Sequence, residues 1–309
     1  MPNFVDMKFT SSTGLNTIYA KKCVPDTEPR AVVQIAHGIV EKIDRYDELM
    51  LYLAEKGFVV VGNDHLGHGK SITKPEEKGF FAARNGWNYV VEDMLRLHDR
   101  MVRDYPGIPY ILFGHSMGSF LTRTYMINYP DKYDCAILSG TGHMGAALIN
   151  AGHAAASLLC KLKGVHADGK LLNDIAFGSY NDKISAPRTA YDWLSRDSEQ
   201  VDKYIADPEC GYICTASVYR DMMYGIKFIT NAKKIAKMDK TKPVYFMSGD
   251  ADPVGEYGKG VERAYKAFCK AGMQDVMIRL YPEGRHEMLN ETNRDDVCRD
   301  ILNWIESKI

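Results

Sequence analysis

The chain has 309 residues, of which 45% are hydrophobic and 26% charged, and its formal net charge is −1. This composition is ordinary for a globular protein with a large core, and the charge balance gives no reason to expect nucleic acid as a partner. Residues 1–6 lack the pattern of a signal peptide, and no apolar run is long enough to span a bilayer.

The cysteines predict a reducing compartment rather than a disulfide framework. There are seven, an odd number at scattered spacings, and no C-x-x-C pair occurs. The nearest two, Cys210 and Cys214, have no matching histidines or cysteines nearby that would complete a tetrahedral metal site. We interpret all seven as reduced thiols, and we expect a cytoplasmic protein.

Apolar strands alternate with amphipathic helices along the first half of the chain. An opening hairpin is expected at 5–10 and 17–21, followed by strand 31–36, helix 44–56, strand 58–62, helix 87–105, strand 108–113, helix 119–129 and strand 134–139. Continuous apolar strands separated by such helices predict an α/β fold with a mainly parallel sheet covered on both faces.

This alternation stops after Thr141 and resumes near residue 240. Between them the sequence predicts helices only, at 143–162, 190–205 and 217–237, and the later elements are strand 243–248, helix 261–271, strand 277–281 and helix 293–307. We therefore expect a core built from residues 1–141 and 240–309, with a helical insertion at 142–239. Such an insertion would cover the carboxyl ends of the strands, where ligands bind in open α/β sheets, and we interpret it as a lid.

The most informative motif is Gly114-His115-Ser116-Met117-Gly118, which lies between an expected strand and an expected helix. G-x-S-x-G in that context is typical of a nucleophile elbow, in which the serine is exposed at a sharp turn. The glycines allow the turn because a Cβ there would clash. Ser116 is therefore the candidate nucleophile.

A serine nucleophile needs a base and an acid that orients the base, and two loops downstream supply candidates. Asp252 follows strand 243–248 and His286 follows strand 277–281, which gives the chain order Ser, acid, His. We predict Asp252 as the orienting acid and His286 as the general base. Asp250, two residues earlier, remains a competing acid.

Two backbone N–H groups are expected to form an oxyanion hole. One is that of Met117, the residue after the nucleophile. The other is that of Ile39, which follows the His37-Gly38 step at the end of strand 31–36. A simple strand-ending turn is the alternative interpretation of His37-Gly38.

Two further glycine-containing segments predict no cofactor. Asn63–Ser71 contains His65, His68 and Asp64, but no further well-placed ligand exists elsewhere, so we interpret it as a structural loop and expect no metal. Gly255–Gly260 does not match a dinucleotide or phosphate-binding loop.

Taken as a set, five motifs resemble those of the monoacylglycerol lipase and lysophospholipase family of α/β-hydrolases, a branch grouped with serine aminopeptidases. They run in order from about residue 31 to 290, and they read His37-Gly38 with Arg45-Tyr46, Asp64-x-x-Gly67-His68-Gly69-x-Ser71, the Ser116 pentapeptide, Gly249-x-x-Asp252-Pro253, and Gly284-x-His286-Glu287. The chain departs from the family at Ile39-Val40-Glu41-Lys42, which is bulkier than the small residue that often follows His-Gly.

The resemblance implies an α/β-hydrolase fold with Ser116, Asp252 and His286 as the triad and with Ile39 and Met117 as oxyanion donors. It favours Asp252 over Asp250, and it implies a serine hydrolase that cleaves esters of monoacylglycerols or lysophospholipids without a metal or organic cofactor. The lid would then admit acyl chains and could make transient contact with a membrane surface. Its candidate entrance residues are Ala146, Ala147, Leu148, Ile149, Ala154, Ala155, Ala156, Leu158 and Leu159, flanked by Lys161 and Lys163. The alternative is that this helix packs its apolar face on the core.

Four other functions are compatible with the same residues. A small-ester esterase would use the same triad. A serine aminopeptidase would need an acidic cluster in the lid for the substrate ammonium, and its candidates are Glu199, Asp202 and Asp207. An acyltransferase would use the same triad with an alcohol other than water. A receptor would keep the pocket with little turnover.

Overall fold

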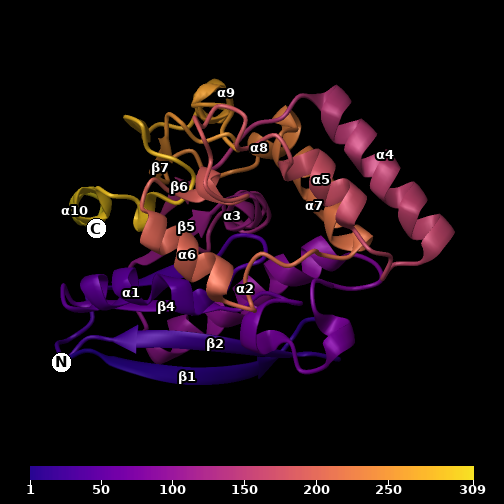
Figure 1. The fold of residues 1–309 in the computed structure, drawn as a ribbon. Helices are drawn as coiled ribbons and strands as arrows, with labels where there is room; N and C mark the ends of the chain where they lie inside the picture. The colour runs from indigo at the N-terminus through magenta and orange to yellow at the C-terminus, as the bar shows by residue number, and fades with distance from the viewer.

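The computed structural model describes all 309 residues and centres on an eight-stranded sheet (Figure 1). Its strands follow the order β1-β2-β4-β3-β5-β6-β7-β8; β1 pairs antiparallel with β2 and β2 with β4, and the strands from β4 to β8 are parallel. The strands are β1 Asn3–Thr10, β2 Thr17–Val24, β3 Ala31–Ala36, β4 Phe58–Asn63, β5 Tyr110–His115, β6 Cys135–Ser139, β7 Val244–Gly249 and β8 Val276–Tyr281. The expected mostly parallel sheet is confirmed.

Helices cover both faces of this sheet, as the continuous apolar strands require. Side chains of β5 alternate between the faces: Ile111 and Phe113 pack with α1 (Asp47–Ala54) and α10 (Arg294–Glu306), while Leu112 packs with the opposite layer. That layer contains α2 (Gly86–Asp104), α3 (Met117–Asn128) and α9 (Lys259–Lys270). The carboxyl end of β5, where α3 begins, therefore lies between two packed layers.

The segment between β6 and β7 contains helices but no strand of the sheet. Its helices are α4 (Ala146–Lys163), α5 (Lys170–Phe177), α6 (Ser198–Ala206), α7 (Ala216–Ile229) and α8 (Ala232–Ile235). Figure 1 shows α4, α5 and α7 grouped at one side of the molecule, with α6 nearer to the sheet. We call residues 142–239 the helical insertion.

Three details of this insertion differ from the sequence-based expectation. The single helix expected at 190–205 is instead a 3-10 turn at Asp192–Leu194 and then α6, whose first N–H groups are capped by Asp197. The helix expected at 217–237 is divided into α7 and α8, where Asn231 caps α8. Helix α5 was not expected. In the first two cases a capping side chain ends the helical periodicity locally.

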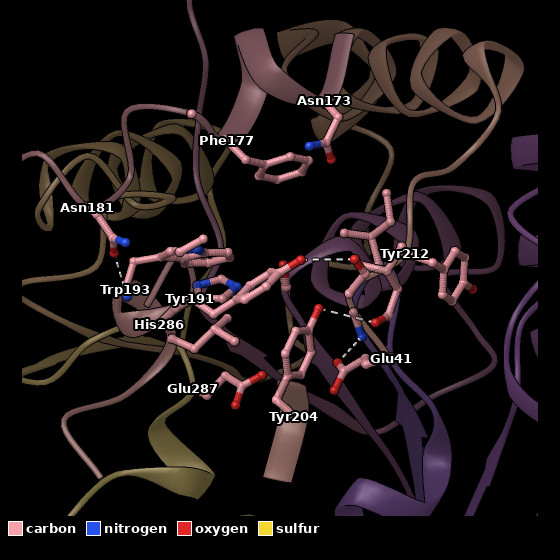
Figure 2. A pocket seen from close by; sticks show the side chains of 18 of the residues that line it. Glu41, Asn173, Phe177, Asn181, Tyr191, Trp193, Tyr204, Tyr212, His286 and Glu287 are labelled. Carbon is pink, nitrogen blue, oxygen red and sulfur yellow. Dashed lines mark hydrogen bonds between the residues drawn. The ribbon is translucent and has the colours of Figure 1, made fainter. Parts of the chain in front are cut away.

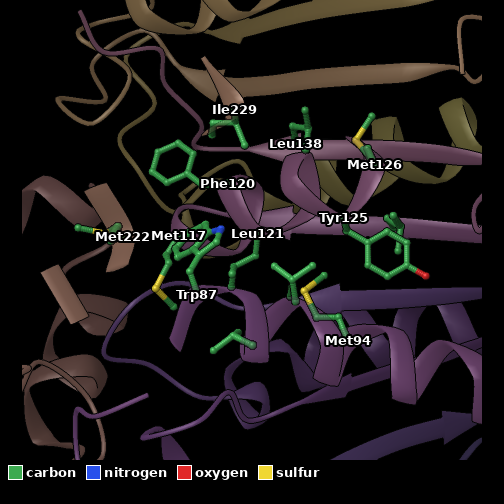
Figure 3. Close-up of a cluster of buried hydrophobic side chains, with 14 of the residues drawn as sticks. Trp87, Met94, Met117, Phe120, Leu121, Tyr125, Met126, Leu138, Met222 and Ile229 are labelled. Carbon is green, nitrogen blue, oxygen red and sulfur yellow. The ribbon is translucent and has the colours of Figure 1, made fainter. Parts of the chain in front are cut away.

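Two buried side chains attach the insertion to the core. Trp87 of α2 packs against α7, where a Cβ on Gly225 would overlap its indole, and its Nε1 donates to Thr124 of α3 at 3.0 Å. Figure 3 shows Trp87 in the same cluster as Leu121 of α3 and Met222 of α7. Thus α7 belongs to the packed core as much as to the insertion.

Arg123 of α3 reaches the start of the insertion and the end of α7. Its fully buried guanidinium donates to the carbonyls of Gly142 at 2.7 Å and Ile229 at 3.3 Å. Since no carboxylate compensates its charge, burial lowers the pKa of Arg123 to about 9.

None of the helices combines the length and apolar character needed to cross a membrane. All seven cysteines are free thiols.

Candidate active site

Ser116 lies at the turn between β5 and α3 in a strained backbone conformation, with φ 52° and ψ −122°. Non-glycine residues rarely adopt positive φ, and such strain clusters at functional sites. The flanking glycines permit the turn because a Cβ on Gly118 would overlap the carbonyl of Ala36, and one on Gly114 would overlap Thr122 and the backbone of Gly118. The motif thus has the strand-turn-helix geometry of a nucleophile elbow.

Asp252 and His286 meet although they are 34 positions apart in the chain. Nδ1 of His286 lies 3.1 and 3.0 Å from the two carboxylate oxygens of Asp252. The hydroxyl of Ser248 and the N–H of Val254 also donate to this carboxylate, at 3.0 and 2.9 Å. Asp250 is instead exposed and accepts from the N–H of Glu283, so the structure pairs His286 with Asp252 and not with Asp250.

Each member of this pair shifts the pKa of the other. Burial raises the pKa of Asp252, but the charge of His286 and the three hydrogen-bonded groups outweigh it, so the pKa is lowered. Burial lowers the pKa of His286, yet the adjacent carboxylate of Asp252 reverses the shift, and the pKa is raised. The arrangement favours an imidazole that donates from Nδ1 to Asp252 and leaves Nε2 free to take a proton.

Two rings fix the plane of the His286 imidazole. The ring of His115 lies with its centroid 4.7 Å away, and that of Trp193, from the insertion, lies 5.2 Å away. His115 stays neutral because burial, aided by His286, lowers its pKa to about 4. Figure 2 shows Trp193 beside His286, on the side of the insertion.

The two backbone donors expected for an oxyanion hole are both free. Met117 begins α3, so its N–H has no acceptor within the helix. The N–H of Ile39 has no protein acceptor at all. Ile39 and Met117 line a cavity together with Ser116.

A polar cavity of about 260 Å³ opens on one side of Ser116 (Figure 2). Its walls include aromatic rings, amides and carboxylates but no lysine or arginine. The lining side chains with polar or aromatic groups are Glu41, His115, Asn173, Asp174, Phe177, Asn181, Tyr191, Trp193, Tyr204, Tyr212, His286 and Glu287.

An apolar cavity of about 350 Å³ opens on the other side of Ser116. Most of its lining residues are hydrophobic, among them Phe120, Met144, Leu148, Leu172, Ile175, Phe177, Met222, Met223 and Ile226. Of the entrance residues expected on α4, only Leu148 lines this cavity. Ile149 and Ala156 are buried in the core cluster, so the alternative of packing on the core is correct for that face of the helix.

A buried ion-pair network beneath the polar cavity was not anticipated from the sequence. Arg45 donates to both carboxylate oxygens of Glu287, at 2.6 and 2.7 Å, and to Glu41 at 2.6 Å. Glu41 also accepts from the Gly38 N–H and from the Tyr46 hydroxyl. Burial raises the pKa of Glu287, but Arg45 outweighs it, and the pKa falls to about 2. Arg45 thereby joins the Ile39 loop to the residue after His286.

Backbone bonds also join the insertion to the loop that carries His286. The N–H groups of His286 and Glu287 donate to the carbonyls of Trp193 and Leu194, at 3.3 and 2.8 Å. Arg285 donates to the carbonyls of Asp192 and Ser195, at 2.6 and 2.9 Å. No local signal could have revealed these contacts, because the partners are about 90 positions apart.

The segment Asn63–Ser71 lies behind the Ile39 loop as a buried histidine cluster. The rings of His65 and His68 lie 4.1 and 5.4 Å from that of His37, and the His65 N–H donates to Nε2 of His37 at 3.0 Å. Burial lowers the pKa of His37 to about 4 and that of His68 to about 3. Asp64 accepts from the N–H groups of Ile43 and Lys70. No three histidine, cysteine or carboxylate side chains are arranged as a metal site.

Comparison with known sequences places the chain in a family. A family model described as serine aminopeptidase, S33 matches residues 27–293. The monoacylglycerol lipase of Mycolicibacterium smegmatis is 29% identical over 304 residues, which cover 97% of this chain and 96% of that protein. The monoglyceride lipase of Rattus norvegicus is 28% identical over 296 residues, covering 94% and 88%.

Solved structures agree with this placement. A thermostable carboxyl esterase from Bacillus coagulans superposes with a TM-score of 0.92 at 29% identity, covering 99% of this chain and 98% of that one. A monoglyceride lipase from Saccharomyces cerevisiae shares the fold with a TM-score of 0.77 at 19% identity, covering 99% and 96%. The chain belongs to the serine aminopeptidase S33 family, and it is a serine hydrolase with the α/β-hydrolase fold.

Proposed function

We propose that this enzyme hydrolyses carboxylic esters of monoacylglycerol type through a Ser116–His286–Asp252 triad. The observation that carries the proposal is the position of Ser116, at the junction of an apolar and a polar cavity, with the bonded His286–Asp252 pair beside it. A lipid ester has the same division, because its acyl chain is apolar and its alcohol is polar.

The reaction follows from the roles of these groups. The Ser116 hydroxyl attacks the acyl carbon while Nε2 of His286 takes its proton, and Asp252 stabilises the imidazolium through Nδ1. The N–H groups of Ile39 and Met117 bind the oxyanion that forms on the carbonyl oxygen. His286 then protonates the leaving alcohol, which gives an acyl-enzyme. Water attacks the acyl-enzyme by the same route and releases the fatty acid.

The charge of the polar cavity favours a neutral alcohol over a phosphate-bearing one. Phosphate groups in proteins are usually bound by arginine, lysine or clustered N–H donors. Here no lysine or arginine lines the cavity, and Arg45 beneath it is already bonded to Glu41 and Glu287. We therefore favour a monoacylglycerol over a lysophospholipid as the substrate.

The aminopeptidase alternative has less support. Glu199, Asp202 and Asp207 do not line either cavity at Ser116. Asp202 pairs with Arg188 at 2.7 Å and Asp207 with Lys42 at 2.7 Å, so neither is free for a substrate ammonium.

We also infer that α4 and α5 meet lipid surfaces. Large apolar side chains on these helices are strongly exposed: Leu148 (60%), Leu158 (56%), Leu162 (72%), Leu171 (65%) and Ile175 (70%). Exposed apolar side chains gathered on one part of a surface mark interaction sites, and loss of vesicle binding in a Leu162→Glu variant is the expected consequence.

The test of the catalytic proposal is hydrolysis of p-nitrophenyl esters from acetyl to palmitoyl, together with monoacylglycerol, lysophosphatidylcholine and aminoacyl amides. Ser116→Ala should lower kcat by at least roughly 10³-fold, since removal of a triad nucleophile costs orders of magnitude. Ser157→Ala, on α4 and outside both cavities, is the matched control and should retain activity.

Other outcomes would redirect the proposal. Near-wild-type esterase activity in Ser116→Ala contradicts the triad. Preference for aminoacyl amides indicates a peptidase, and product esters formed with an added alcohol indicate an acyltransferase. Ligand binding without fluorophosphonate labelling of Ser116 indicates a receptor.

A further inference from the structure

Val40, the residue after the oxyanion donor Ile39, has an unusual backbone conformation. Its φ is +51°, in the left-handed region. For a β-branched residue this conformation is a genuine outlier, since its Cβ crowds the following carbonyl, and it persists only where surrounding contacts hold it.

The contacts that hold the Val40 carbonyl come from the helical insertion and not from the core. The N–H of Gly211 donates to it at 2.9 Å, and the hydroxyl of Tyr204 donates to it at 3.2 Å. Figure 2 shows Tyr204 rising from α6 toward this loop, beside Glu41. Gly211 is itself held by Tyr191, whose hydroxyl donates to the Gly211 carbonyl at 2.9 Å.

Tyr204 is well fixed for such a role. It is only 5% exposed, and the guanidinium of Arg45 lies 4.9 Å from its ring centroid. Because Arg45 is bonded to Glu41 and Glu287, the ring of Tyr204 is in contact with the network that joins the two catalytic loops. The hydroxyl at the end of this ring donates to the Val40 carbonyl.

Hydrogen bonds hold the backbone on each side of Ile39: the peptide that carries the Ile39 N–H is bonded through its Gly38 carbonyl, and the Val40–Glu41 peptide is bonded through the Val40 carbonyl. The Gly38 carbonyl lies 2.7 Å from Nδ1 of His37, and the Gly38 N–H donates to Glu41. The Val40 carbonyl is held by Tyr204 and Gly211. Between them the Ile39 N–H has no protein acceptor, and Ile39 lines both cavities at Ser116. Loss of the bonds to Val40 would let this residue relax from its strained conformation. The rotation would turn the Ile39–Val40 peptide and, through Ile39, the preceding peptide that carries the Ile39 N–H.

We propose that Tyr204 is a positioning residue that, with the Gly211 N–H, holds the strained Val40 so that the Ile39 N–H points at the oxyanion. The oxyanion site is then complete only while segment 204–211 is seated on the Ile39 loop. This inference rests on the proposed function, because it takes the Ile39 N–H as an oxyanion donor.

The test is a double-mutant cycle between Tyr204→Phe and Val40→Gly. Tyr204→Phe removes the hydroxyl and keeps the ring against Arg45. It should lower kcat roughly 10-fold with KM within about twofold, a fraction of the 10²–10³ that loss of a whole oxyanion donor costs. Glycine adopts positive φ without strain, so in the Val40→Gly background the same change should cost less than about twofold.

The affinity of a transition-state analogue tests the oxyanion site separately from turnover. A trifluoromethyl ketone forms a tetrahedral adduct on the serine whose oxyanion needs the same donors, so its affinity should fall by the factor lost in kcat/KM. Tyr224→Phe, on α7 and 43% exposed, is the matched control and should change neither quantity. Melting temperatures of all variants exclude a general loss of fold.

The proposal is overturned if Tyr204→Phe lowers kcat by the same factor in the wild type and in Val40→Gly. It is also overturned if Tyr204→Phe leaves kcat unchanged in both. Fluorophosphonate labelling separates this from a failure of the proposed function. A wild-type enzyme labelled at Ser116 but insensitive to Tyr204→Phe contradicts only the role of Tyr204. A wild-type enzyme that is not labelled at Ser116 contradicts the catalytic proposal itself.

Discussion

The helical insertion has two parts that differ in what they contact. Residues 146–177, the apolar arm, contain α4 and α5, and these helices pack on α7 while exposing large apolar side chains such as Leu162 and Ile175. Residues 190–215, the anchored arm, are bonded instead to the loops that carry Ile39 and His286. The apolar arm lines both cavities at Ser116, whereas the anchored arm lines only the polar one.

This difference indicates a division of labour within one insertion. Contacts of the apolar arm are mostly non-directional, so its helices can shift and still bury the same surface. Contacts of the anchored arm are hydrogen bonds and ion pairs with fixed geometry, and they end on groups that the proposed mechanism uses. We therefore expect changes in the apolar arm to alter substrate capture, and changes in the anchored arm to alter the chemical step.

The largest effect is expected from Arg285→Met, which removes the two bonds that hold the carbonyls of Asp192 and Ser195. Hydrogen bonds to a charged donor contribute about 1.5–3 kcal/mol each, so opening of the anchored arm should become easier by about 3–6 kcal/mol. Hydrogen exchange of residues 190–215 should rise while that of α4 does not, and kcat should fall on the order of 100-fold.

Arg188→Met is the matched control for that experiment. Arg188 lies just before the anchored arm, but its guanidinium pairs with the exposed Asp202 and is itself exposed. The Arg188→Met variant should leave hydrogen exchange of residues 190–215 and kcat nearly unchanged. If Arg285→Met increased exchange in α4 as much as in the anchored arm, the two arms would form one cooperative unit and the division would be wrong.

The next effect is expected from Leu162→Glu on the apolar arm. Burial of a leucine side chain in an apolar medium contributes about 1.5–3 kcal/mol, so binding to phosphatidylcholine vesicles should weaken by roughly 10–100-fold. Hydrolysis of soluble p-nitrophenyl butyrate should stay within about twofold of wild type. Leu15→Glu, at the exposed β1–β2 turn, is the control, and an equal loss of vesicle binding there would contradict a specific lipid-facing arm.

The same contrast explains how much of the molecule the sequence could predict. Strands and helices of the core are encoded locally, because each apolar run or amphipathic period reports on its own environment. Ser116, Asp252 and His286 follow strand ends, so a parallel sheet brings their loops to one edge. The positions of these three residues therefore follow from the order of strands and motifs along the chain, and Asp252 meets His286 as expected.

The anchored arm could not be predicted in this way. Trp193, Tyr204 and Arg285 act through partners 90 or more positions away, and pairing at that distance leaves no periodic signal. One local signal was available: Asp197, followed by Ser-Glu-Gln, is a helix N-cap pattern that would have divided the helix expected at 190–205. Helix α5 was missed because its eight residues, ending at Gly178, are too few for a clear period.

The smallest effect concerns pH and contrasts Trp193→Ala with Phe177→Ala. His286 must be neutral to act as the base, and its pKa is raised because the attraction of Asp252 outweighs burial. Activity should therefore be lost as the pH falls through a value above 6.5, the ordinary pKa of histidine. Trp193, with its centroid 5.2 Å from that of His286, supplies part of the burial that lowers the pKa. Its removal admits water, so the acidic limb of kcat/KM should move to higher pH by roughly half a unit.

Phe177 ends α5 in the apolar arm and stacks on Trp193, with the two ring centroids 6.3 Å apart, which makes it the matched control within the same cavity. Phe177→Ala should change KM without moving the limb. A limb that moves to lower pH in Trp193→Ala, or moves equally in both variants, would show that the anchored arm does not set the environment of the catalytic base.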